Sequence, residues 1–117
     1  MYPSGVWRGF WEQPHFGRQA MSDFRLRFAE GAIDGDGVDI VGRFTFHGAY
    51  DDRGHVRLIK QYIDRHAVLY VGTPDGEGSI AGTWTVSSES YSLAGPFVMQ
   101  PVFGTSVAGM AIQEIVK

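Results

Sequence analysis

Residues 40–63 read IVGRFTFHGAYDDRGHVRLIKQYI and contain two runs in which apolar and polar residues alternate. Alternation with a period of two is typical of β-strands that have one buried face. The two runs are separated by Asp52-Arg53-Gly54, a three-residue loop in which the glycine supplies the positive φ of a type I turn followed by a bulge. The stretch therefore predicts a β-hairpin in which Phe46 lies opposite Lys60.

Further strand-like runs lie on both sides of this hairpin, with turn signals between them. These runs cover residues 6–12, 24–28, 67–73, 79–86 and 96–100. Ile33-Asp34-Gly35 is interpreted as a second three-residue loop, which joins the run 24–28 directly to the strand that begins at Ile40. Asp64-Arg65 and Asp75-Gly76 are interpreted as two-residue turns. With these turn lengths one apolar face continues from strand to strand, and a slip of one residue would break it.

This pattern predicts an all-β fold, a single antiparallel up-and-down β-barrel of seven or eight strands. Strands without helices have to cover their own apolar face, and closure into a barrel does so while removing the sheet edges. In this register Lys60 points inward and lies opposite Leu69. Residues 105–117 fit either a short helix or, over 108–116, an eighth strand that pairs with the first. The predicted interior consists of Trp7, Trp11, Phe24, Leu26, Phe28, Ile40, Phe44, Phe46, Val56, Leu58, Lys60, Tyr62, Ala67, Leu69, Val71, Ile80, Trp84, Phe97 and Met99.

Length and composition limit the class of protein. The 117 residues are expected to form one domain, residues 1–117, since chains below about 150 residues rarely divide. The absence of cysteine excludes disulfides and thiolate metal sites, and the scattered histidines predict no metal site or cofactor. A net charge of −3 argues against nucleic-acid binding. With no apolar run near 20 residues and no signal-peptide pattern, we expect no membrane span and a cytoplasmic protein.

Two short motifs add a resemblance. Gly5-Val6-Trp7 lies on the first predicted strand, and Gly82-Thr83-Trp84 on the sixth. Together with the antiparallel meander, they resemble the calycin group, which comprises lipocalins, fatty-acid-binding proteins and avidins. In lipocalins the first-strand tryptophan closes one end of the barrel, and Trp7 occupies that position here. The chain has no Thr-Asp-Tyr motif and no recognisable biotin site. The resemblance therefore implies only a barrel with a cavity, and no particular ligand.

Lys60 is the anomaly of the predicted interior, because it lies on the apolar phase of its strand. A buried ammonium is unfavourable unless it is paired, and burial depresses its pKa. Lys60 could bind a ligand carboxylate, or act as a base or imine-forming nucleophile. It could equally extend to the barrel mouth or pair with a carboxylate whose position the sequence does not reveal.

The aromatic interior provides the rest of the candidate site. A pocket for a small hydrophobic or aromatic molecule would be lined by Trp11, Phe44, Phe46, Lys60, Tyr62 and Trp84. In this hypothesis Lys60 and Tyr62 meet the polar end of the ligand. The same aromatic side chains could instead fill the barrel as a packed core.

Three functions follow from these alternatives. The first is binding of a hydrophobic or aromatic small molecule, with no catalytic residue assigned. The second is a barrel cyclase or isomerase. Against it, the predicted interior of this chain contains no carboxylate or histidine that could act as the acid–base partner of Lys60. The third is a structural module with a filled core that forms oligomers.

The outer face of the predicted barrel points to self-association. Val41, Ile59, Ile63, Val68 and Tyr70 would form an apolar sector on this face. Because such a sector usually contacts a partner, we expect a homo-oligomer that is formed through it.

Overall fold

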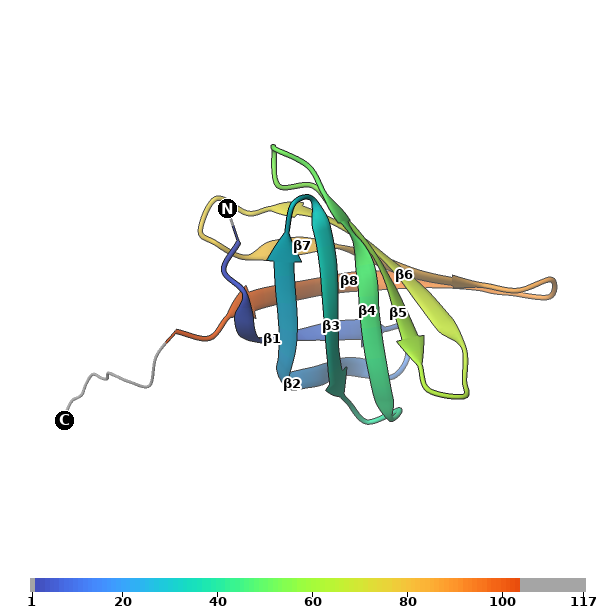
Figure 1. Ribbon diagram of the computed structural model, residues 1–117. Coiled ribbons are helices and arrows are strands. Elements are labelled where there is room, and N and C mark those ends of the chain that lie inside the picture. The colour runs from blue at the N-terminus through green and yellow to red at the C-terminus, as the bar shows by residue number, and fades with distance from the viewer. Residues whose placement is uncertain (1, 104–117) are drawn as a thin grey trace.

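The computed structural model describes residues 2–103, which form a closed barrel of eight antiparallel strands (Figure 1). Each strand pairs with the next one along the chain, and the last strand pairs with the first. The strands are β1 (Gly5–Gln13), β2 (Gly17–Ala29), β3 (Ala32–Val38), β4 (Arg43–Tyr50), β5 (Val56–Tyr62), β6 (Ala67–Pro74), β7 (Ile80–Ser87) and β8 (Ser92–Pro101). The predicted up-and-down barrel is therefore confirmed, with eight strands. Residues 105–117, for which a helix or a strand was expected, lie outside the described residues.

The central hairpin has the predicted register. Phe46 lies opposite Lys60 and Phe44 opposite Tyr62 in the β4–β5 pair. All four side chains are buried, as the alternation in residues 40–63 predicts. At the turn, the Asp51 amide donates to the His55 carbonyl, which matches a three-residue loop.

The first correction concerns β3. The predicted loop Ile33-Asp34-Gly35 is wrong, because these residues lie within a strand that separates β2 from β4. Aspartate and glycine form turns readily, but here the glycines serve close packing: a Cβ atom at Gly37 would overlap the side chains of Phe24 and Phe44. Ile33 takes the inward place that was assigned to Ile40, which lies beyond the strand and is 78% exposed.

The second correction concerns β6, whose inward and outward faces are exchanged relative to the prediction. The turn before β6 contains three residues, not two, since the Tyr62 amide donates to the His66 carbonyl and Asp64 has a positive φ of 58°. Lys60 therefore lies opposite Val68 instead of Leu69. Because side chains alternate along a strand, this one-residue shift moves the whole strand to its other face.

The exchange of faces in β6 changes the predicted interior and the predicted outer sector together. Val68 and Tyr70, assigned to the outer face, are buried in the barrel. Ala67 and Val71, assigned to the interior, are exposed, and Leu69 is only partly buried.

The face of β7 is nevertheless as predicted. The turn after β6 is also longer than two residues, because the Asp75 amide donates to the Ser79 carbonyl. The combined error in the two turn lengths leaves Ile80 and Trp84 on the inward face, where both are buried. Trp7, Trp11, Phe97 and Met99 are buried in the interior as well.

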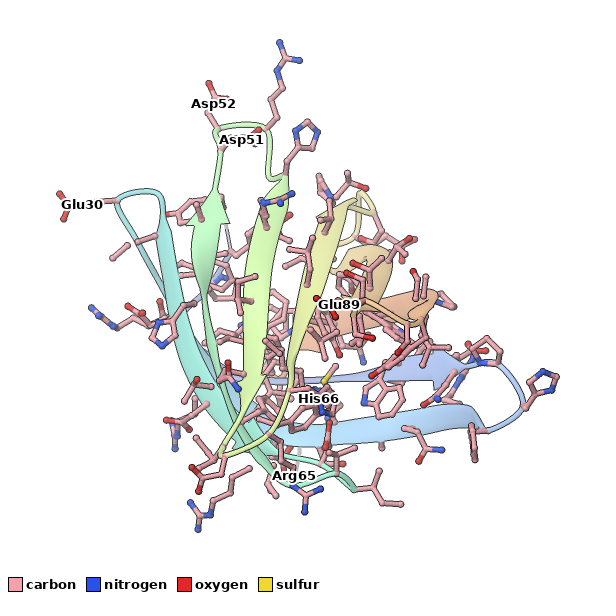
Figure 2. All side chains as sticks on the ribbon, turned by 90° about the vertical axis from the view of Figure 1, so that its right-hand side faces the viewer. Glu30, Asp51, Asp52, Arg65, His66 and Glu89 are labelled. Atoms are coloured by element: carbon pink, nitrogen blue, oxygen red, sulfur yellow. The ribbon has the colours of Figure 1, made fainter. Side chains whose placement is uncertain are left out.

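The two ends of the barrel differ. At the closed end, Trp7 is fully buried against Tyr2 and Phe28, and the Tyr2 hydroxyl donates to the Gly54 carbonyl at 2.6 Å. The loops at this end carry the labelled acidic residues Glu30, Asp51 and Asp52, whereas Arg65 and His66 mark the opposite end (Figure 2). Within residues 2–103 there is no helix, so none could span a membrane.

Candidate functional site

A cavity of about 240 Å³ opens at the end of the barrel opposite Trp7. Its walls come from β1 and β5–β8, from the loop between β3 and β4 and from the hairpin that joins β7 to β8. In Figure 1 this hairpin extends well beyond the body of the barrel. The lining residues are Trp11, Gln13, Val41, Tyr62, His66, Val68, Tyr70, Trp84, Val86, Tyr91 and Leu93.

The predicted ligand-binding residues divide into two layers. Trp11, Tyr62 and Trp84 line the cavity. Phe44, Phe46 and Lys60 do not line it, and all three are buried in the interior. The sequence therefore predicted part of the wall and part of the layer behind it.

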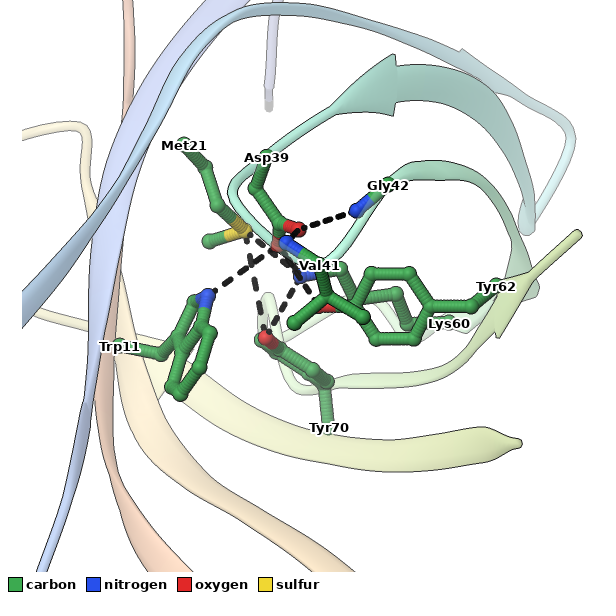
Figure 3. A network of polar contacts seen from close by, with 8 residues as sticks. All are labelled: Trp11, Met21, Asp39, Val41, Gly42, Lys60, Tyr62 and Tyr70. Atoms are coloured by element: carbon green, nitrogen blue, oxygen red, sulfur yellow. Dashed lines mark hydrogen bonds and ion pairs between the residues drawn. The ribbon is translucent and has the colours of Figure 1, made fainter. Parts of the chain in front are cut away.

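Lys60 is held by an ion pair in that second layer. Its Nζ lies 2.7 Å from Oδ2 of Asp39, and neither side chain is exposed to solvent. The same ammonium lies 3.3 Å from the Tyr70 hydroxyl and 3.3 Å from the sulfur of Met21 (Figure 3). It also lies 4.3 Å from the ring centre of Phe44. Lys60 thus has a full set of partners within the protein.

Asp39 is the centre of this network. Its Oδ2 accepts hydrogen bonds from the Tyr62 hydroxyl at 2.6 Å and from the Trp11 indole at 3.2 Å, in addition to Lys60. Its Oδ1 accepts from the backbone amide of Val41 at 2.9 Å (Figure 3). One side chain therefore joins the β3–β4 loop to β1 and β5 and to part of the cavity wall.

Asp39 is also the residue of this candidate site that was not predicted from the sequence. The sequence left open which carboxylate, if any, pairs with Lys60. The signal was available in the period-two pattern: Ile33 points inward, and counting by two from it passes through Gly35 and Gly37 to Asp39. The false turn at residues 33–35 concealed this pattern.

The electrostatics of the network follow from burial and from the ion pair. Burial lowers the pKa of Lys60 to about 8, although the nearby Asp39 carboxylate acts in the opposite direction. For Asp39, burial alone would raise the pKa, but the attraction and hydrogen bond of Lys60, together with the other donors, lower it overall. Burial and the Asp39 charge raise the pKa values of Tyr62 and Tyr70. At pH 7 the network therefore contains one cation, one anion and two neutral phenols.

The polar atoms of the cavity wall are largely occupied. The indole N–H of Trp84 donates to the Glu12 carbonyl at 2.8 Å. The indole N–H of Trp11 and the hydroxyl of Tyr62 both donate to the Asp39 carboxylate. Within residues 2–103, no hydrogen bond involves the side chains of the lining residues Gln13, His66 and Tyr91. Because His66 is exposed, Tyr91 is 52% exposed and Gln13 is partly exposed, the groups that can still bond a ligand lie at the rim.

Across residues 2–103, no group of three or more histidine, aspartate or glutamate side chains is arranged to hold a metal ion. Comparisons of the chain with protein families, with curated proteins and with solved structures found no match in any of the three.

Proposed function

We propose that this protein binds a small hydrophobic or aromatic molecule in the cavity at the open end of the barrel. The observation that carries the proposal is the difference between the two ends. Trp7 and Tyr2 fill one end, whereas at the other end apolar side chains surround an unfilled space and remain partly exposed, Leu93 at 37%. Pockets that bind small molecules are concave and lined mainly by apolar and aromatic side chains with a few polar groups.

A closed end with a tryptophan and an open end with a cavity is the arrangement that a calycin-like barrel implies. We infer a calycin-like carrier on this basis, with the ligand inserted from the open end. The cavity is smaller than the roughly 300–1,000 Å³ of pockets that hold drug-sized ligands. With about 240 Å³, it suits one ring with a short substituent better than a long acyl chain.

The structure favours a supporting role for Lys60 over direct contact with the ligand. Its ammonium is neutralised by Asp39, and both side chains are fully buried. A cyclase or isomerase that used this pair would need to bring substrate to groups that the cavity does not reach. The ligand instead contacts Trp11, Tyr62 and Trp84, with His66 at the rim of the cavity.

The proposal is tested by blocking the cavity. Val86 lines the cavity wall and is partly buried, so Val86→Trp places an indole in the space that the ligand would occupy. Val71→Trp makes the same change on the outer face of the neighbouring strand, where the residue is 43% exposed, and serves as the matched control. A panel of one- and two-ring aromatic compounds would be titrated while the indole N–H signals are followed by NMR.

We expect one or more compounds to shift the signals of Trp11 and Trp84 in the native protein and in Val71→Trp, and not in Val86→Trp. Trp7, at the closed end, provides an internal reference whose signal stays in place. A panel that shifts none of the three signals at millimolar concentration would reject the proposed function, as would equal binding by Val86→Trp.

A further inference from the structure

The aromatic residues of this chain are sorted by type around the cavity. Five of its eight tryptophans and tyrosines line the cavity: Trp11, Tyr62, Tyr70, Trp84 and Tyr91. None of the eight phenylalanines lines it, although all of them lie within residues 2–103. The wall is therefore built from the aromatic side chains that carry a polar atom and the most electron-rich rings.

The hydrogen-bond donors of these rings face away from a ligand. Both indole N–H groups and the Tyr62 hydroxyl donate to protein oxygen atoms, and the Tyr70 hydroxyl lies between Lys60 and the Met21 sulfur. A ligand carbonyl or carboxylate would find free donors only at the rim. What the deeper wall still offers is the ring surfaces themselves.

The charges around the cavity do not favour an anion either. No lysine, arginine, aspartate or glutamate is among the lining residues. The cation behind the wall, Lys60, is already neutralised by Asp39 at 2.7 Å. A buried carboxylate on the ligand would therefore lose its hydration without gaining a counter-ion.

The barrel already contains one cation that aromatic rings stabilise. The Lys60 ammonium lies 4.3–5.7 Å from the ring centres of Phe44, Tyr62, Tyr70 and Trp11, within the distance of about 6 Å over which a ring face attracts a cation. Next to this layer, Trp11 and Trp84 meet at 80° with centres 5.9 Å apart, so two walls of the cavity form a corner. Organic cations are attracted by the faces of aromatic rings, and by tryptophan most strongly.

We infer that the ligand is an organic cation, namely a methylated ammonium group carried on a small ring or short chain. This inference rests on the proposed function and specifies the chemical class of ligand for the same cavity. A quaternary, fully methylated ammonium has no N–H donor to satisfy, and its charge is attracted by the tryptophan and tyrosine faces. Its apolar methyl groups pack against Val41, Val68 and Val86.

Two ligands of the same shape separate charge from hydrophobicity. Phenyltrimethylammonium and tert-butylbenzene differ by one positive charge, and benzoate provides an anion of similar size. Each would be titrated into the native protein, with the indole N–H signals of Trp11 and Trp84 as readout and that of Trp7 as reference. We expect phenyltrimethylammonium to bind about five- to tenfold more tightly than tert-butylbenzene, and benzoate more weakly than either.

A pair of variants at the rim tests whether the rings cause this preference. Tyr91 lines the cavity and is 52% exposed, so its replacement does not threaten the fold. Tyr91→Leu retains apolar contact but removes the ring, and we expect it to weaken phenyltrimethylammonium binding about two- to fivefold while leaving tert-butylbenzene unchanged. Tyr91→Phe retains a ring and is expected to keep most of the preference.

The outcomes separate this inference from the proposed function. Binding of tert-butylbenzene as tight as that of phenyltrimethylammonium would overturn the cation inference and leave a hydrophobic carrier. Tighter binding of benzoate would overturn it as well. If none of the three ligands, nor any aromatic compound of the earlier panel, shifted the signals of Trp11 and Trp84, both proposals would fail together.

Discussion

The side chains of Lys60 and Asp39 have no surface exposed to solvent, and each charge needs the other. Removing one partner of a buried ion pair leaves an uncompensated charge, whereas removing both can be nearly neutral. The network also holds Tyr62 and Trp11 in the cavity wall through Asp39 Oδ2. At the scale of single residues, the pair is therefore expected to matter for both stability and the shape of the cavity.

A double-mutant cycle measures this dependence. We expect Asp39→Asn to lower the free energy of unfolding by about 3–5 kcal/mol, because the Lys60 ammonium then lacks its counter-charge. The double variant Asp39→Asn/Lys60→Met is expected to lose less than Asp39→Asn alone. Urea unfolding at pH 7 provides the values. A coupled pair would be contradicted if the double variant lost as much free energy of unfolding as Asp39→Asn and Lys60→Met lose together.

The same pair predicts how stability depends on pH. Lys60 has a pKa of about 8 in the folded protein and 10.5 as an ordinary lysine, so between these values the folded state holds fewer protons than the unfolded chain. The contribution of Lys60 to the free energy of unfolding therefore becomes more favourable to the folded state as the pH increases through this range. The raised pKa values of Tyr62 and Tyr70 have the opposite effect, but only above about pH 10.

Urea unfolding at pH 7.0, 8.0, 9.0 and 9.5 would measure this contribution. It is the free energy of unfolding of the native protein minus that of Asp39→Asn/Lys60→Met. We expect the difference to shift in favour of the native protein with each step above about pH 8. A difference that stays constant would show that Lys60 keeps an ordinary pKa in the folded state, and one that moves toward the double variant would show a raised pKa; either result would contradict the lowered pKa.

At the scale of elements, the turns decided which predictions were correct. The β4–β5 hairpin could be predicted because Gly54 marks its loop, with a positive φ of 85°. In the turn before β6 the positive φ belongs to Asp64, a residue that gives no such signal in the sequence. The length of that turn, and with it the inward face of β6, could therefore not be deduced from the residues alone.

The candidate site was predictable to the same extent as the strands. Alternation placed Trp11, Tyr62 and Trp84 inward, and the structure brings them to one cavity. Tyr70 was assigned to the outer face because of the turn error. Whether an inward side chain faces a cavity or a packed layer depends on contacts between distant strands, which explains why Lys60 and its partner were not resolved in advance.

The turn before β6 makes its own prediction. A residue with a β-branched side chain is strained at a φ of 58°, whereas glycine is not. We expect Asp64→Val to lower the free energy of unfolding by about 1–2 kcal/mol and Asp64→Gly to leave it unchanged or raise it slightly. Thermal unfolding of both variants, with Asp64→Ser as an exposed polar control, distinguishes the two. Equal stability of the valine and glycine variants would contradict a positive φ at this position.

At the scale of the whole molecule, large exposed apolar side chains gather on the turns at one end, which also carry Asp64, Arg65 and Glu89. The turns at the closed end carry Glu30, Asp51, Asp52, Asp75 and Glu77, whereas Phe16, Ile40, Ile63 and Tyr91 are exposed on the turns at the open end. Acidic side chains keep the filled end solvated, and the apolar ones surround the entrance to the cavity. This polarity is consistent with a barrel that admits its ligand from one side.

The outer surface of the barrel retains an apolar strip after the correction of β6. Ile59 on β5 is 44% exposed and lies opposite Leu69 on β6, next to Val71 at 43% exposure. An exposed apolar strip on a sheet is usually covered by a partner, and a second copy of the same strip covers it through a single two-fold contact. We therefore predict a homodimer that is formed through the outer faces of β5 and β6.

Light scattering coupled to size-exclusion chromatography tests the dimer over a range of protein concentrations. Ile59→Asp introduces a charge into the strip and is expected to give a folded monomer, because the side chain contributes little to the barrel interior. Val38→Asp makes a matched change at a position that is 56% exposed on β3, away from the strip, and should leave the dimer intact. Since the cavity opens at the end of the barrel and Ile59 does not line it, ligand affinity should survive dissociation. A native protein that is monomeric at every concentration, or a dimer that Ile59→Asp does not disrupt, would exclude this face as the interface.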